Sequence, residues 1–188
     1  MLKHLADERL FVEITGFKNV EADKPDQLLK ALRGGIQTKV VAQFFNANIV
    51  ATWRHLYFAV LDALMAFKTK RNISRNLAVE VILYASAQRQ IKKAIDIIGV
   101  KNGCSDIAVV VIGGSRGAVE SVLTSISGHF HREPDDRVLD LSPSKTQAIR
   151  QVFQITETEL NVVAKQNDME RALVDLVVER MALLSTRL

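Results

Sequence analysis

The sequence contains a single cysteine and no long apolar run, and each shortage excludes a class of protein. Cys104 alone cannot form an internal disulfide or supply a cysteine-based zinc site, which fits a reducing compartment. The apolar run from Ile107 to Gly114 falls far short of the ~18 residues that a membrane-spanning helix needs. Residues 1–8 contain no hydrophobic stretch of the kind that a secretory signal requires. We therefore expect a soluble, cytoplasmic protein with no membrane segment.

Acidic residues are scarce in one region of the chain. Between residues 65 and 101 only Glu80 and Asp96 are acidic, whereas eight residues are basic, so the region has a net charge of +6. The rest of the chain has a net charge of −2, and the whole chain has +4. Concentrated positive charge is the usual electrostatic signature of a polyanionic partner. The alternative is an ordinary solvent-exposed face of lysines and arginines.

The apolar content is sufficient for a core, since 48% of the 188 residues are hydrophobic. Strands are predicted at residues 10–14, 39–45 and 107–112, the last buried on both faces. Helices are predicted at residues 25–33, 49–67, 75–84 after an N-cap at Ser74, 91–98, 116–127, 144–153, 156–165 and 169–187. We expect an α+β fold in which a small mixed or antiparallel sheet packs against a larger set of helices. The whole chain, 1–188, is predicted to be a single domain with a loop insertion near 129–140.

One loop is a candidate for catalytic chemistry. Gly113-Gly114-Ser115-Arg116-Gly117 follows the buried strand and opens a helix, where backbone amides can hold a phosphate. Its spacing matches neither the dinucleotide-binding nor the P-loop pattern. A small enzyme that binds a nucleotide at this loop is one alternative function.

Other polar combinations are weaker candidates. His129 and His131 lie near acidic residues but lack the spacing of metal ligands. His55 and Asp62 fall on one side of a predicted helix, as a charge relay or as a polar seam. We expect no metal and no cofactor, and the lack of a strong catalytic motif favours a binding protein over an enzyme.

Two predicted helices have apolar arcs wider than a single core contact requires. In the last helix Val174, Val178 and Met181 extend the arc to about 240°. Such a helix is either central to the fold or covered by a partner. In the helix at 49–67, Ala59, Ala63 and Ala66 line a second side beside a predicted core face of larger residues: Trp53, Leu56, Tyr57, Val60 and Leu64.

Several segments together resemble the PRPK-binding protein family, the small subunit of the KEOPS complex of archaea and eukaryotes. They are the alanine-rich helix ATWRHLYFAVLDALMAF, the basic residues 68–72, the helix 76–87, the segment from Arg89-Gln90-Ile91 to Gly99, residues 145–153, Ile155-Thr156 with Glu159-Leu160, and residues 179–184. The combination covers most of the chain in the family's order. The chain departs from the family at Ser86-Ala87-Gln88, where a glycine is common, and at 129–140.

The resemblance implies a non-enzymatic subunit of the complex that installs a threonylcarbamoyl group on a tRNA adenosine. In the family this subunit binds the single-stranded 3′ CCA end of tRNA and contacts the kinase-like ATPase subunit. The expected tRNA surface is Lys68, Lys70, Arg71, Asn72, Arg75, Arg89, Lys92 and Lys93. The expected contact with the kinase-like subunit is Val174, Val178 and Met181. A purely structural adaptor is a further alternative.

Overall fold

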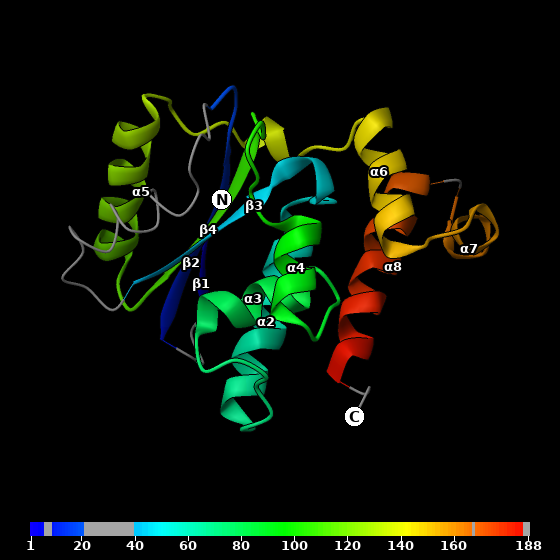
Figure 1. Cartoon of the computed structure of the whole chain (residues 1–188), viewed down its shortest axis with the longest axis horizontal. Coiled ribbons are helices and arrows are strands. Elements are labelled where there is room, and N and C mark those ends of the chain that lie inside the picture. The colour runs from blue at the N-terminus through cyan, green and yellow to red at the C-terminus, as the bar shows by residue number, and fades with distance from the viewer. Residues whose placement is uncertain (6–8, 21–39, 167, 186–188) are drawn as a thin grey trace. The chain divides into compact units, whose positions relative to one another are not determined.

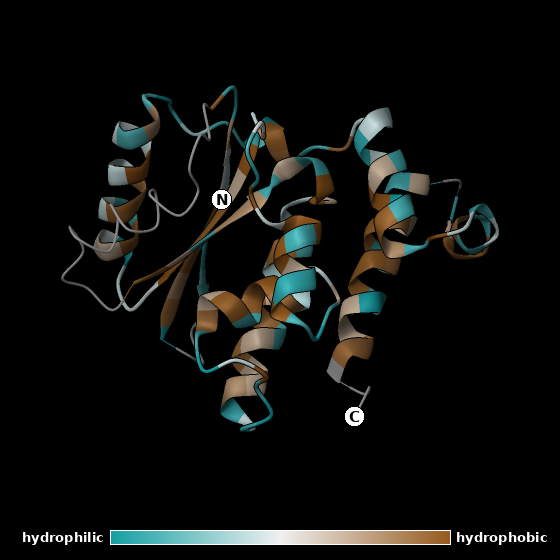
Figure 2. Cartoon of the chain, viewed as in Figure 1, coloured by the Kyte–Doolittle hydropathy of each residue, from teal (hydrophilic) through white to brown (hydrophobic). Residues whose placement is uncertain are grey.

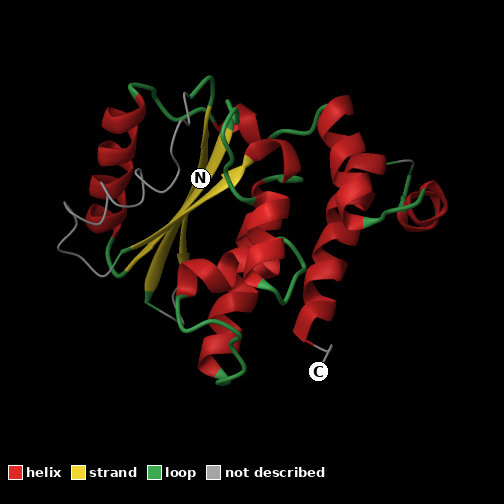
Figure 3. Ribbon diagram, in the orientation of Figure 1, coloured by secondary structure: helices red, strands yellow, loops and turns green. Residues whose placement is uncertain are grey.

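The structure, a computed structural model, describes residues 1–5, 9–20, 40–166 and 168–185. The helix predicted after Pro25 lies outside the described residues. The chain divides into two compact units. Figure 3 distinguishes the strands from the helices. A sheet unit combines residues 1–47 with 100–138, and a helical unit combines residues 48–99 with 139–188.

The sheet unit contains four antiparallel strands. They are β1 (Leu2–Leu5), β2 (Leu10–Phe17), β3 (Val41–Asn46) and β4 (Ile107–Gly113), in the spatial order β1-β2-β4-β3. Ile14 of β2 pairs with Val110 of β4, and Phe44 of β3 pairs with Val109. Every residue of β4 is buried, which confirms the buried strand predicted from its continuous apolar run. The short strand β1 was not predicted.

Helix α5 (Arg116–Phe130) covers one face of this sheet (Figure 1). Its N-terminus is capped by Ser115, whose side-chain oxygen accepts the N–H of Ala118. Alternate residues of a strand project to the same side of a sheet. The residues that project toward α5 are apolar. The buried cluster between them consists of Phe17, Val20, Phe44, Ile107, Val109, Val111, Val119, Val122 and Ile126.

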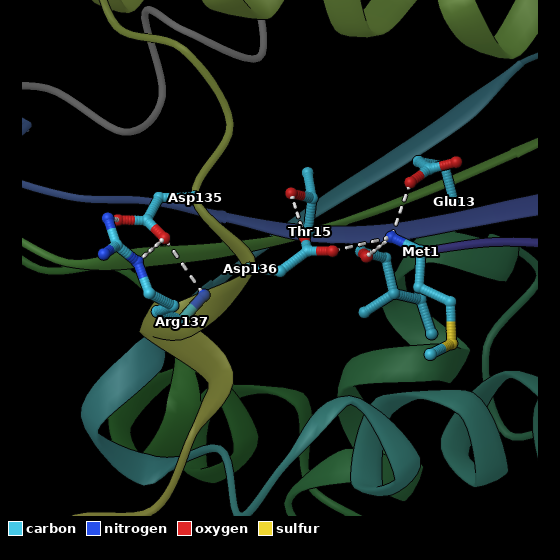
Figure 4. Close-up of polar contacts among 7 residues, drawn as sticks. Met1, Glu13, Thr15, Asp135, Asp136 and Arg137 are labelled. Atoms are coloured by element: carbon cyan, nitrogen blue, oxygen red, sulfur yellow. Dashed lines mark hydrogen bonds and ion pairs between the residues drawn. The ribbon is translucent and has the colours of Figure 1, made fainter.

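The segment predicted as a loop insertion is attached to β2 (Figure 4). The hydroxyl of Thr15 donates to Asp136 at 2.7 Å, and the N–H of Asp135 donates to the carbonyl of Gly16 at 2.8 Å. The ammonium group of Met1 pairs with Glu13 at 2.6 Å and with Asp136 at 3.4 Å. Within 129–140, the first two residues end α5 and a 3-10 turn, η3, spans Asp136–Leu139. The stretch is therefore ordered against the sheet, and its being an insertion stays a prediction.

The helical unit contains six α-helices among the described residues. They are α2 (Trp53–Lys68), α3 (Leu77–Ala85), α4 (Ile91–Ile98), α6 (Pro143–Phe153), α7 (Glu157–Val163) and α8 (Met169–Ala182). Short 3-10 turns lie before α2 (η2, Ala47–Ile49) and after α8 (η4, Leu183–Ser185). The hydropathy of each helix is shown in Figure 2.

Helix α2 buries its alanine side. Ala59 and Ala63 have no exposed surface and Ala66 only 4%, whereas Trp53 and Tyr57 are half-buried. The predicted core face is therefore wrong in part: Leu56 and Val60 are fully buried, but Trp53 and Tyr57 are not, and the alanine side is buried as well. Small side chains allow closer approach of neighbouring helices, here α3 and α8.

The antiparallel sheet and the set of helices confirm the predicted α+β class. The prediction of a single domain stays a prediction. No helix within the described ranges is both long enough and apolar enough to cross a bilayer.

Candidate nucleic-acid and partner interfaces

A basic link, residues 68–75, connects α2 to α3. The side chains of Lys68, Lys70, Arg71 and Arg75 are exposed. The backbone turns out of α2 at Lys70, whose φ is +57°, in the left-handed region. In the described part of the chain no carboxylate forms an ion pair with Lys70, Arg71 or Arg75. Their charges are thus exposed and are not paired with any carboxylate in the ranges that the structure describes.

The basic link is held in place by a buried carboxylate. Glu80 has no exposed surface, and it accepts the N–H of Ile73 at 3.0 Å and the N–H of Ser74 at 2.7 Å. The side-chain amide of Asn72 donates to the carbonyl of Ser74 at 2.9 Å. Asn72 is therefore used at least partly to shape the link. Glu80 is a residue that the sequence analysis missed as part of this site.

The N-cap of α3 is Asn76, not Ser74 as predicted. Its side-chain oxygen accepts the N–H of Ala78 at 2.9 Å and that of Val79 at 3.4 Å. The hydroxyl of Ser74 instead accepts the N–H of Asn76 at 3.1 Å. Serine and asparagine are both favourable N-caps. The N–H of Ser74 is bonded to Glu80, so Ser74 still belongs to the link, and the helix begins after Asn76.

The remaining predicted tRNA residues lie at the other end of α3. Arg89, Lys92 and Lys93 are exposed at the start of α4, and nine helical residues separate this end from the basic link. At 1.5 Å per residue that separation is about 13 Å along the axis. The predicted surface therefore consists of two basic groups rather than one. Lys92 and Lys93 themselves point about 100° apart around α4.

Arg89 also has a structural contact. Its guanidinium donates to the carbonyl of Leu184 at 3.4 Å, which connects the start of α4 to the turn after α8. A substitution at Arg89 would therefore disturb the packing as well as the surface charge. Lys70 and Arg71 are better positions at which to test RNA contact.

Helix α4 exposes part of its apolar face. Ala94 and Ile98 have no exposed surface, whereas Ile91 and Ile95 are 45% and 47% exposed. The four residues have the spacing of one helix face, which is typical of a face that packs on a core along its whole length. The exposed pair lies on the side of Lys92, which places apolar surface beside a positive charge.

The three residues predicted to contact the kinase-like subunit differ in exposure. Met181 has no exposed surface and Val174 only 4%, and α8 packs within the helical unit against α2, α3, α6 and α7. Only Val178 is half-exposed. The wide apolar arc of α8 is thus largely explained by a central place in its own unit. Leu183, directly after α8, is 37% exposed and extends the accessible apolar surface.

Comparison with known proteins identifies the family. The model of the kinase-binding protein CGI-121 family matches residues 17–185. This chain belongs to the CGI-121 family. The regulatory protein Cgi121 of Methanocaldococcus jannaschii is 37% identical over 113 residues, which cover 60% of this chain and 70% of that protein. The resemblance predicted from the sequence is confirmed, and the individual contact residues stay predictions.

In the glycine-rich loop of this CGI-121 family member, Ser115 caps α5 and Arg116 is paired on the helix surface. The hydroxyl of Ser115 accepts the N–H of Ala118, and Arg116 pairs with Glu120 at 2.6 Å. Packing favours glycine at position 113, because an added Cβ would lie 3.0 Å from a methyl carbon of Val119, closer than most Cβ contacts. Gly114 and Gly117 have open space around them. A nucleotide site at this loop stays a prediction. The family and its relative are described by kinase binding and regulation, which supports a non-enzymatic protein.

His55 and Asp62 do not form a relay. The Nδ1 atom of His55 accepts the N–H of Ala51 at 3.2 Å, and Nε2 lies 2.7 Å from the carbonyl oxygen of Ala85. Burial lowers the pKa of His55 to about 4, so the ring is neutral. Burial raises the pKa of Asp62 to about 6. In the described residues no group of three histidine, cysteine or acidic side chains could hold a metal ion.

Proposed function

We propose that this chain is the non-catalytic KEOPS subunit that binds the 3′ CCA end of tRNA and docks on the kinase-like ATPase subunit. The observation that carries the RNA part is the basic link, a loop fixed on a buried glutamate. Its Lys70, Arg71 and Arg75 are exposed, and none of them forms an ion pair with a described carboxylate. Membership of a kinase-binding family carries the protein part.

The chemistry of the basic link suits a single-stranded RNA end. Lysine and arginine neutralise phosphates and release counterions, and arginine can also stack on a base. Ile73 is 36% exposed within the link, and Met65, near the end of α2, is 57% exposed. Apolar side chains between cations offer surface to the faces of unpaired bases, as grooves that bind single strands do. The exposed Ile91 and Ile95 beside Lys92 give the second basic group the same combination.

Charge reversal in the basic link tests the RNA part. We expect Lys70→Glu with Arg71→Glu to weaken tRNA binding by more than about tenfold. The slope of log affinity against log salt concentration should decrease in magnitude by about one per lost phosphate contact. The matched control reverses two exposed lysines outside both basic groups, Lys101→Glu with Lys165→Glu, and has the same change in charge. Equal affinities of the two double variants would contradict the assignment, leaving a protein adaptor.

The accessible apolar residues at the end of α8 are the proposed contact with the kinase-like subunit. Val178 and Leu183 retain exposed surface there, in contrast to Val174 and Met181. A charged side chain at an apolar contact must be desolvated, so we expect Leu183→Glu or Val178→Glu to abolish co-purification. Val162→Glu, at a residue on α7 that is 80% exposed, is the control and should leave the complex intact. An intact complex with both test variants would contradict this contact.

A further inference from the structure

Glu80 is an acidic residue beneath a surface whose proposed ligand is a polyanion. It belongs to the first turn of α3 and is completely buried. Its side-chain contacts are backbone amides: Ile73 donates to Oε1 at 3.0 Å and to Oε2 at 3.1 Å, and Ser74 donates to Oε2 at 2.7 Å. Among the described residues no lysine or arginine forms an ion pair with it.

Capping of α3 does not by itself account for this arrangement. The side chain of Asn76 already accepts the amides of Ala78 and Val79, two of the four donors that a helix N-terminus leaves unsatisfied. The Glu80 carboxylate instead accepts amides that precede the N-cap, in the middle of the basic link. Its hydrogen bonds therefore fix the link and are separate from the cap that Asn76 provides.

We propose that Glu80 is the positioning residue of the 3′-end surface. By fixing the amides of Ile73 and Ser74, it holds Lys70, Arg71 and Arg75 in one arrangement before RNA binds. A loop that is already ordered loses less conformational freedom on binding, and this preorganisation strengthens binding. Glu80 itself touches no RNA. This inference rests on the proposed RNA function and specifies how the surface is built.

Positioning and simple electrostatics predict opposite results for Glu80→Gln. Removing a negative charge beneath a polyanion-binding loop makes the site more positive, so electrostatics alone predicts equal or tighter binding. Positioning predicts weaker binding, because glutamine has only one accepting oxygen. Its NH2 group would replace one of the two carboxylate oxygens that the Ile73 N–H contacts, and would set a donor against a donor. The sign of the change therefore separates the two effects.

The experiment compares wild type, Glu80→Gln and Glu179→Gln for binding to tRNA and to tRNA without its CCA end. Glu179 is exposed on α8, so its variant has the same charge change without the link contacts. We expect Glu80→Gln to weaken binding of intact tRNA on the order of tenfold, the size of one lost buried hydrogen bond. Binding of tRNA without CCA should stay as in wild type, and Glu179→Gln should weaken neither.

The inference would be overturned if Glu80→Gln bound intact tRNA as tightly as wild type or more tightly. It would also be overturned if the substitution weakened binding equally for intact tRNA and for tRNA without CCA. Failure of the proposed function is distinguishable, because wild type would then not discriminate between the two RNAs. Hydrogen exchange on the wild-type protein needs no variant. The amides of Ile73 and Ser74 should be protected in the absence of RNA although the link is on the surface, and free exchange at both would overturn the inference.

Discussion

The imidazole of His55 connects α2 to the end of α3, with Nε2 only 2.7 Å from the carbonyl oxygen of Ala85. Since Nδ1 accepts the N–H of Ala51, the proton must reside on Nε2. The ring is completely buried and lies edge-on to Phe153. A second proton on this ring would remove an acceptor and place a charge in the core of the helical unit.

Stability should therefore decrease in acid in a way that depends on His55. Burial lowers its pKa from 6.5 to about 4, so the unfolded chain takes up a proton at a pH where the folded chain does not. The contribution is complete above pH 6.5 and is lost as the pH falls toward 4, by up to about 3 kcal/mol. Urea unfolding at several pH values gives the free energy of unfolding as a function of pH. Between pH 6.5 and pH 4 this free energy should decrease less steeply for His55→Gln than for wild type. Identical slopes would contradict the prediction.

Asp62 should have the opposite effect. Burial raises its pKa from 3.8 to about 6, and no described residue forms a hydrogen bond or ion pair with its carboxylate. The folded chain therefore binds the proton more tightly, and the penalty of the charged form is complete above pH 6. We expect Asp62→Asn to raise the melting temperature at pH 7.5 and to change it less at pH 4.5. A lower melting temperature at pH 7.5 would show that the carboxylate has a stabilising role.

The connection between α7 and α8 depends on Glu159. Its carboxylate accepts the N–H and hydroxyl of Thr156 in a capping box and also pairs with Arg180. The hydrogen bond from the Thr156 N–H, with that from Arg180, lowers the pKa of Glu159 to about 2. We expect Thr156→Ala to cost about 1 kcal/mol of unfolding free energy, the usual cost of a lost N-cap. Thr158→Ala, at an exposed neighbouring position, should change the urea midpoint much less.

Two glycines of the sheet unit should respond in opposite directions to alanine. A Cβ at Gly16 would lie 2.6 Å from Cβ of Val138, so Gly16→Ala should destabilise by about 1–3 kcal/mol through overpacking. Gly128 lies inside α5 with open space around it, so Gly128→Ala should stabilise by about 0.5–1 kcal/mol. We expect the denaturant midpoint of Gly16→Ala to lie below that of wild type and the midpoint of Gly128→Ala to lie above it. Midpoints on the same side would contradict this packing.

Local signals predicted much of the fold. The apolar run of β4 and the end of α4 at Gly99 follow from residues close in sequence. The strand β1 could not be predicted, because its four residues are fixed by pairing with β2 and not by their own pattern. Periodicity also could not reveal that Ile91 and Ile95 are exposed, since burial depends on which neighbours a helix has.

The charged residues of the candidate site could be predicted from the sequence, but the buried glutamate that holds the basic link could not. The excess of lysine and arginine located the basic link, and the family resemblance specified an expected ligand. The contact between Glu80 and the amides of Ile73 and Ser74 depends on how the link folds back over α3. An acidic residue in a basic region carries no local sign of that contact.

The central claim is that this chain recognises the 3′ end of tRNA. Its most direct test is the affinity of the purified protein for tRNA and for tRNA lacking the terminal CCA, at two salt concentrations. We predict tighter binding of the intact RNA at both salts, with the affinity for each RNA decreasing as salt rises. Equal affinities for the two RNAs, or no binding to either, would contradict the claim.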